Sequence, residues 1–233
     1  MKILKNKNAV FIIASAILCS IFMCLADGVF KFPYLIKSCV KIILFAAVPI
    51  GYSLLNKKEN KGAQIEIFSL FRPAKKIFLL ALAFGVAVFG VILGAYFLLS
   101  PVIDFSGITQ SLTSGAGVGK YNFLFVSIYI SFVNSFLEEF FFRGFSFLLL
   151  KKESTRSVAY IFSSACFAFY HAGMTSGWFN IGVYLISVVG LFVGGCIFNY
   201  LDEKSKSLYP SYLVHMFANF AINLIGFIMF GII

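Results

Sequence analysis

Apolar stretches of about twenty residues recur along the whole sequence, and this pattern constrains the fold more than any other feature. A helix of that length crosses a hydrocarbon core of about 30 Å. Composition agrees, since 61% of the 233 residues are hydrophobic and only 12% are charged, roughly half the charged share of soluble domains. We therefore predict an all-α fold, a polytopic transmembrane bundle of about seven to eight helices that forms one membrane domain over residues 1–233.

Two of the predicted spans are irregular. The second carries Lys37 and Lys41 in its first half, so these lysines must either snorkel to the outer interface or mark a short interfacial helix. The fourth exceeds the length of a crossing and is predicted to be tilted, broken or extended beyond the bilayer. Between spans two and three, residues 65–71 form either an amphipathic surface helix or a plain loop. The seven spans are about 8–26, 34–55, 77–99, 122–150, 157–173, 179–200 and 211–232.

The basic residues predict an orientation in a cell membrane. The formal net charge is +10, but no block of Lys and Arg is interleaved with aromatic residues, so nucleic acid is not a predicted partner. Fourteen basic residues fall in the segments on the side of the N-terminus and four on the other side. Such an excess is typical of cytoplasmic segments. We predict a cytoplasmic N-terminus, with the lipid bilayer as surroundings.

Ionisable side chains inside the spans are the candidate functional groups, because burial of charge in a membrane costs several kcal/mol. The fourth span holds Glu138, Glu139 and Arg143 within the run NSFLEEFFFR. Glu139 and Arg143 are four residues apart and share a helix face, whereas Glu138 points about 100° away. This spacing leaves Glu138 to face a cavity as a general base. The alternative is an ion pair that serves helix packing alone.

The two histidines of the chain form the other clusters. His171 follows Phe167 by one helical turn in the fifth span, and His215 is followed at four-residue steps by Asn219 and Asn223 in the seventh. Each pattern also has a structural interpretation, since membrane histidines and asparagines often bond neighbouring helices. By residue count His171 falls near the outer end of its span and His215 near the inner end. A shared cavity therefore requires tilted helices or different span boundaries.

Carboxylate, imidazole and amide groups in one wet cavity can activate a water molecule and stabilise an oxyanion. Thr175 and Ser211 stand four residues from the histidines and would be nucleophiles in another chemistry, but we interpret them as caps or loop residues. No cofactor is certain. A divalent metal such as zinc, held by Glu138, His171 and His215, is an open alternative, although the HExxH pattern is absent.

Taken together, the residues resemble the CPBP family of intramembrane proteases, also called Abi, which includes the type 2 CAAX prenyl endopeptidases. The family pattern is EExxxR, then FxxxH, then HxxxN. The sequence matches all three motifs in order over about residues 122–223. The matching residues are Glu138, Glu139, Arg143, Phe167, His171, His215 and Asn219.

The resemblance implies an intramembrane endopeptidase that cuts a peptide or membrane-protein substrate near the cytoplasmic side. In this interpretation Glu138, assisted by His171, activates water, and His215 and Asn219 stabilise the oxyanion. Glu139 and Arg143 organise the site. The family is often called one of metalloproteases, while its prenyl proteases suggest a metal-free glutamate mechanism. A bacterial source is expected from the Lys, Asn, Ile and Phe richness.

Two other functions are compatible with the same polar cavity. One is a non-catalytic membrane protein, such as a bacteriocin self-immunity factor or a regulator that holds a sensor. The other is a transporter or proton relay, although the sequence has no repeat symmetry. The substrate, the biological process and the oligomeric state are not fixed by the sequence.

Overall fold

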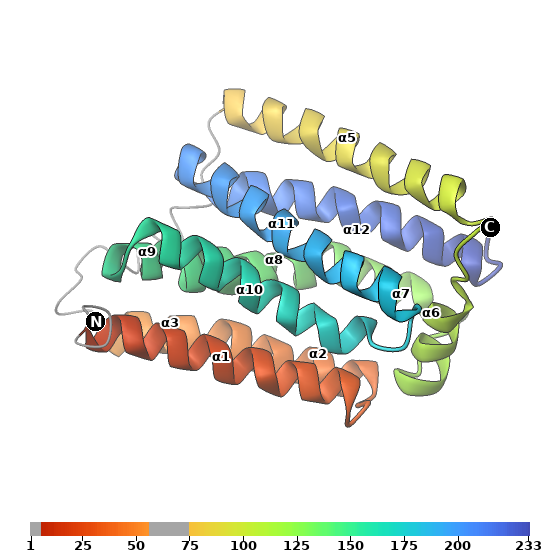
Figure 1. Cartoon of the computed structure of the whole chain (residues 1–233), viewed down its shortest axis with the longest axis horizontal. Helices are drawn as coiled ribbons and strands as arrows, with labels where there is room; N and C mark the ends of the chain where they lie inside the picture. The colour runs from red at the N-terminus through yellow and green to blue at the C-terminus, as the bar shows by residue number, and fades with distance from the viewer. Residues whose placement is uncertain (1–5, 56–74) are drawn as a thin grey trace.

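The computed structural model describes residues 6–55 and 75–233, and within these ranges the secondary structure is entirely helical (Figure 1). The predicted all-α membrane bundle is confirmed, whereas residues 65–71 lie outside the described residues. The segments labelled η are π-helical. The elements are α1 (Lys7–Gly28), α2 (Tyr34–Ile42), η2 (Ile43–Ala47), α3 (Val48–Leu55), α5 (Lys75–Leu99), α6 (Ser106–Gln110), η3 (Ser111–Gly115), α7 (Phe123–Ile128), η4 (Tyr129–Asn134), α8 (Ser135–Glu138), η5 (Glu139–Leu149), α9 (Leu150–Glu153), α10 (Arg156–Thr175), α11 (Ile181–Ser205) and α12 (Tyr209–Met229).

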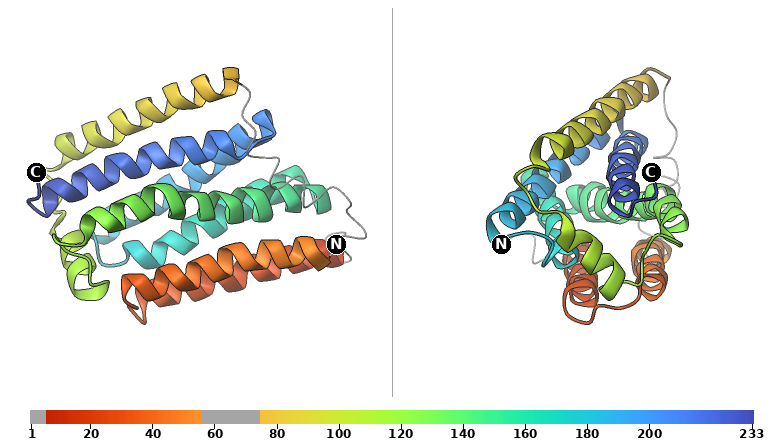
Figure 2. Two further views of the ribbon diagram at one scale, coloured as in Figure 1. Left: turned by 180° about the vertical axis from the view of Figure 1, so that it is seen from behind. Right: turned by 90° about the vertical axis from the view of Figure 1, so that its right-hand side faces the viewer.

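Each of the seven predicted spans corresponds to a helix or to a run of consecutive helices. Six of these are long and apolar enough to cross a membrane by length and composition. The remaining one is α10, the fifth span in sequence order. It is 20 residues long, and its buried residues include two serines and His171. Figures 1 and 2 show the helices side by side, with α5 next to α12 at one edge and α1 with α2 and α3 at the other.

The fourth predicted span is a continuous helical run of 31 residues, Phe123–Glu153. Its extra length is absorbed by two π-helical segments, η4 and η5, in which the backbone is wider than in an α-helix. π-Helical turns are rare and often occur at functional sites. Here η5 begins at Glu139, so the change of helix type falls within the carboxylate motif.

An aromatic core fixes this long helix against its neighbours. Phe45 of η2 stacks on Phe141 of η5, with ring centroids 4.2 Å apart and planes at 6°. Phe45 also contacts Phe142 and, from α10, Tyr170, both edge to face. All four rings are at most 1% exposed. Because offset and edge-to-face ring pairs have specific geometry, the cluster fixes η2, η5 and α10 relative to one another.

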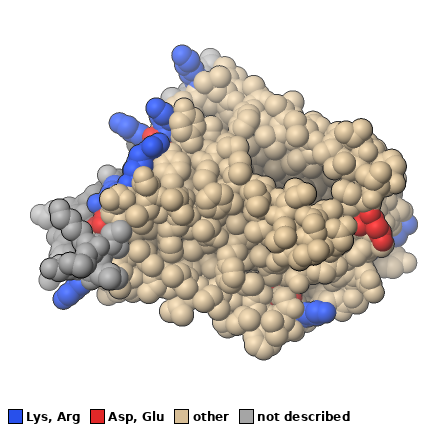
Figure 3. Space-filling view, in the orientation of Figure 1, with Lys and Arg blue, Asp and Glu red and all other residues tan. Residues whose placement is uncertain are grey.

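Basic side chains gather at the end of the bundle where the N-terminus lies (Figure 3). α1 begins there at Lys7, the α9–α10 junction contributes Lys151 and Arg156, and α11 ends there beyond Lys204. This distribution is the one that the positive-inside rule describes. The cytoplasmic location of this end stays a prediction.

Replacing Gly173 by Ala is expected to destabilise the bundle. A Cβ atom at Gly173 of α10 would lie 2.4 Å from the backbone oxygen of Cys24 in α1, so the two helices would have to separate. Overpacking of this kind costs about 1–3 kcal/mol. Gly190→Ala in α11 is the matched control, because nothing lies within 4 Å of its added Cβ. Thermal unfolding in detergent checks both, and an unchanged midpoint for Gly173→Ala would contradict the close contact.

Candidate active site

Three helices bring the predicted carboxylate and imidazoles together. Oε2 of Glu138, the last residue of α8, lies 3.5 Å from Nε2 of His171 in α10 and 3.8 Å from Nε2 of His215 in α12. The three residues are 1%, 9% and 7% exposed. These groups come from parts of the chain that are 33 or more positions apart, and their meeting is a result of tertiary packing.

The two histidines lie near the ends of their helices, as predicted. α10 ends two residues later than expected, at Thr175, and α12 begins two residues earlier than expected, at Tyr209. The start of α12 is itself inside the protein, since Leu208 and Ser211 are fully buried. The start of α12 is therefore enclosed by the protein, and His215, one to two turns further on, contacts Glu138.

The two oxygens of Glu138 have different surroundings. Oε1 accepts hydrogen bonds from Nδ2 of Asn134 at 2.7 Å and from the hydroxyl of Tyr170 at 3.0 Å, and it lies 3.3 Å from Nζ of Lys41. Oε2 has no hydrogen-bond partner in the described structure. Within the described ranges, both imidazoles lie within 4 Å of Oε2. One oxygen of the carboxylate is therefore fully hydrogen-bonded, and the other is available to a reactant.

Each imidazole is oriented through its other nitrogen. Nδ1 of His171 lies 2.8 Å from the backbone oxygen of Phe167, and Nδ1 of His215 lies 2.7 Å from Oε1 of Glu139. Since both partners are acceptors, each Nδ1 carries the proton and each Nε2 is directed at Glu138.

Glu139 and Arg143 form the ion pair that their four-residue spacing predicts. The distance from Nε of Arg143 to Oε2 of Glu139 is 3.2 Å, and both side chains are fully buried. The guanidinium carbon lies 4.1 Å from the ring centroid of Phe167 and 5.0 Å from that of Phe198. Aromatic faces attract a cation that has left water. Arg143 therefore holds Glu139, which in turn holds His215.

The polar stripe of α12 pairs with a stripe of serines that the sequence analysis missed. Nδ2 of Asn219 donates to Oγ of Ser135 at 2.8 Å and lies 3.4 Å from the backbone oxygen of Ile130. One turn further on, Nδ2 of Asn223 donates to Oγ of Ser131 at 3.0 Å. Asn219 thus uses its amide hydrogens within the bundle. Ser131, Ser135 and Glu139 follow one another at four-residue steps, as do the polar residues of α12. This common spacing could have indicated that the two helices pack antiparallel along these faces.

Sequence reasoning also missed three groups around Glu138. Lys41 was predicted to snorkel or to mark an interfacial helix, and that was wrong, because its side chain is 11% exposed and lies against Glu138. Its ammonium donates to Oδ1 of Asn134 at 2.6 Å and to the hydroxyl of Tyr170. Asn134 stands four residues before Glu138 and Tyr170 directly precedes His171, so proximity to the motifs was an available signal.

The hydroxyl side chains considered as nucleophiles bond elsewhere. Thr175 Oγ1 donates to the backbone oxygen of His171 at 3.1 Å, and Ser211 Oγ donates to Oδ2 of Asp202 at 2.7 Å. Neither hydroxyl has a hydrogen bond to an imidazole nitrogen among the contacts of the described residues. Asp202 is fully buried at the end of α11, and its bonds to Ser211 fix the start of α12.

The metal alternative can be compared with this geometry. Glu138, His171 and His215 converge, and both imidazoles have the outer hydrogen bonds that metal ligands usually show. However, no group of three or more His, Cys, Asp or Glu side chains in the described ranges has the arrangement of a metal site.

Comparison with known proteins gives one match. Residues 120–221 match the family model described as Type II CAAX prenyl endopeptidase Rce1-like. This segment contains all the motif residues, from Glu138 to Asn219, but not Lys41. Searches of curated proteins and of solved structures found no match.

Proposed function

We propose, from the match of residues 120–221 to the Rce1-like family of type II CAAX prenyl endopeptidases, that this chain is an intramembrane endopeptidase in which Glu138 activates water. The proposed substrate is a peptide or the membrane segment of another protein, cut near the cytoplasmic side. The observation that carries the proposal is the convergence of Oε2 of Glu138 with Nε2 of His171 and His215.

Water is the reactant that such a set of groups accommodates. One water molecule between Oε2 and the imidazoles can donate to the carboxylate and to Nε2 of neutral His171. Glu138 then takes a proton from the water molecule while the water oxygen forms a bond to the carbonyl carbon of the peptide. The carbonyl oxygen becomes an oxyanion. Collapse breaks the C–N bond, and the proton held by Glu138 passes to the departing amine. A positioned general base contributes about 10²–10⁴-fold to such a reaction.

The two histidines have different roles in this proposal. Nδ1 of His215 is held by the Glu139 carboxylate, and in this proposal Nε2 of His215 is the donor that binds the oxyanion. His171 is backed by a backbone carbonyl and suits the acceptor role beside Glu138. Asn219 is committed to Ser135 and Ile130, and its role as an oxyanion donor would require it to give up one of these bonds.

Cleavage in ¹⁸O-labelled water is the test of this function. Purified protein in lipid nanodiscs is incubated with a library of membrane-spanning peptides, and products are identified by mass spectrometry. We expect one ¹⁸O atom in each new C-terminal carboxylate, because water supplies the attacking oxygen, and the product masses give the cut position. A parallel reaction with a chelator tests the metal, since loss of cleavage would indicate a metal ion, for which Glu138, His171 and His215 are the predicted ligands. Absence of any product across the library would contradict the proposed function.

A further inference from the structure

A lysine from outside the family segment enters the candidate site. Lys41 belongs to α2, 97 positions before Glu138 in the sequence, and its side chain is nearly buried. Burial of a charged amine is costly unless each donor is bonded. An ammonium has three hydrogens, and Lys41 has three oxygen neighbours, on Asn134, Tyr170 and Glu138. The number of acceptors equals the number of ammonium hydrogens, which indicates a specific binding site for the Lys41 side chain.

The direction of each hydrogen bond in this cluster follows from Lys41. An ammonium only donates, so the Asn134 amide must turn its Oδ1 toward Lys41 and its Nδ2 toward Glu138. The Tyr170 hydroxyl likewise accepts from Lys41 and sends its own hydrogen to Glu138. Both groups thereby donate to the same oxygen, Oε1, at 2.7 and 3.0 Å.

We propose that Lys41, through Asn134 and Tyr170, is a positioning residue that holds Oε1 of Glu138 and thereby presents Oε2 to His171 and His215. This role rests on the proposed function. A carboxylate is free to exchange its two oxygens by rotation in a uniform environment. Three donors on Oε1 and none on Oε2 remove that freedom, so the base is fixed in one orientation before substrate arrives.

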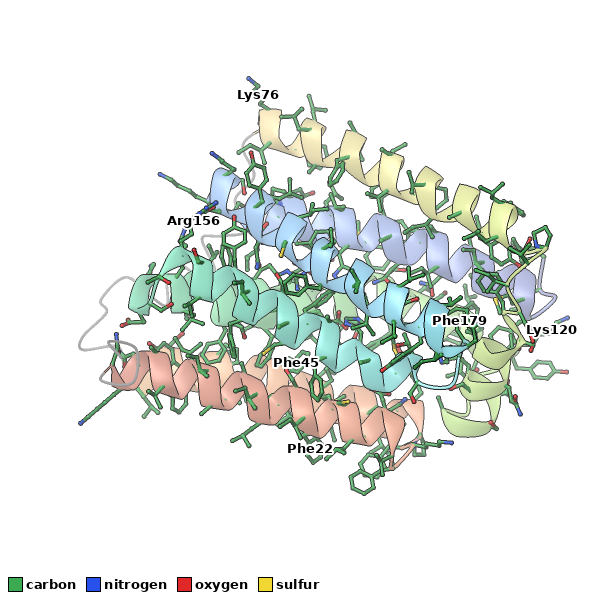
Figure 4. All side chains as sticks on the ribbon, viewed as in Figure 1. Phe22, Phe45, Lys76, Lys120, Arg156 and Phe179 are labelled. Carbon is green, nitrogen blue, oxygen red and sulfur yellow. The ribbon has the colours of Figure 1, made fainter. Side chains whose placement is uncertain are left out.

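The surrounding core keeps the lysine in place. Phe45, labelled in Figure 4, follows Lys41 by one helical turn and packs on Phe141 and Tyr170. The ammonium also lies 4.8 Å from the ring centroid of Tyr170, within the range of a cation–π contact. Since Phe141 is on the same helical run as Glu138, the aromatic cluster fixes the distance between the lysine and the carboxylate.

The kinetic test compares two lysines of the same helix. Lys41→Met should lower kcat for peptide cleavage about 10²-fold, the size of effect that misplacement of a reacting group by about 1 Å produces. KM should change little, because in this proposal Lys41 acts on Glu138 and its partners and not on the substrate. Lys37→Met is the matched control, since Lys37 pairs with Asp27 at 2.5 Å. Equal kcat values for Lys41→Met and wild type would overturn the proposal.

A milder pair of variants serves if Lys41→Met does not fold. Tyr170→Phe keeps the ring in the core and removes one donor from Oε1, and we expect kcat to fall about 10-fold, a smaller loss than removal of the cation. Tyr184→Phe is its control, because the Tyr184 hydroxyl donates to the backbone oxygen of Ala172 at 3.2 Å, between α11 and α10. Equal kcat values for Tyr170→Phe and Tyr184→Phe would overturn the role of this donor.

A second readout is independent of peptide cleavage. The chain has only two histidines, so protein labelled with ¹³C at histidine Cε1 and freed of any tag gives two signals. Lys41→Met and Tyr170→Phe each remove a donor from Oε1 of Glu138; we call the three donors on this oxygen the clamp. Because Oε2 lies beside both imidazoles, movement of Glu138 should displace both signals. Lys37→Met should leave them unchanged. Unmoved signals would overturn the positioning role. If wild type cleaves nothing, displaced signals still support the clamp while the proposed function fails.

Discussion

Glu138→Gln is expected to lower the rate of peptide cleavage about 10³-fold, within the range that a positioned general base contributes. Gln has the shape of Glu and keeps one oxygen that Asn134 and Tyr170 can donate to. Its amide cannot take a proton from water, so the variant removes the base and leaves the cavity. The rate is measured with the peptide that wild type cuts fastest, at equal amounts of folded protein.

Glu153→Gln is the matched control for this substitution. Glu153 lies at the end of the same helical run, where its carboxylate accepts from Nδ2 of Asn6 at 2.8 Å. We expect its cleavage rate to equal that of wild type. Full activity in Glu138→Gln would remove the general base from the mechanism. If wild type cuts no peptide but has a cellular phenotype that survives Glu138→Gln, the non-catalytic binding protein becomes the better hypothesis.

Arg143→Met is expected to lower the free energy of unfolding by about 3 kcal/mol, because removal of one partner leaves a buried charge without compensation. Both Arg143 and Glu139 are fully buried, so water cannot replace the lost cation. The guanidinium also fills the space between Phe167 and Phe198. Denaturant unfolding in mixed micelles, followed by tryptophan fluorescence of Trp178, gives the difference from wild type.

The double variant Glu139→Gln/Arg143→Met separates charge from packing. It removes both charges, and we expect it to recover a large part of the lost stability. Replacement of both partners of a buried ion pair by uncharged residues often changes the free energy of unfolding little. It should also cleave peptide more slowly than wild type, because His215 no longer has a carboxylate on Nδ1. A double variant no more stable than Arg143→Met would show that the arginine acts mainly by packing.

The parts of the site that the sequence predicted are those set by spacing within one helix. Glu139 and Arg143 are four residues apart and do form an ion pair. His215, Asn219 and Asn223 also follow one another at four-residue steps and share the face that meets the serine stripe. Residues at such spacing lie on one side of any regular helix, so these neighbourhoods need no knowledge of the fold.

Contacts between helices could not be predicted in the same way. Lys41 was assigned to the membrane interface because a lysine near a helix end usually reaches toward water, and only the packing of η2 against η5 and α10 turns it inward. The contact of His215 with Glu138 could not be derived from a count along the sequence either, because such a count does not show that Leu208 and Ser211, at the start of α12, are enclosed by the protein.

The sequence by itself determined that this chain is a membrane helix bundle, because runs of about twenty apolar residues can satisfy their backbone groups in lipid only as helices. It also determined which costly side chains the bundle must contain. Tertiary structure alone decided which of them meet, which oxygen of Glu138 is clamped and which nitrogen of each histidine is free. These depend on the rotation and depth of each helix against its neighbours, and packing between distant segments sets both.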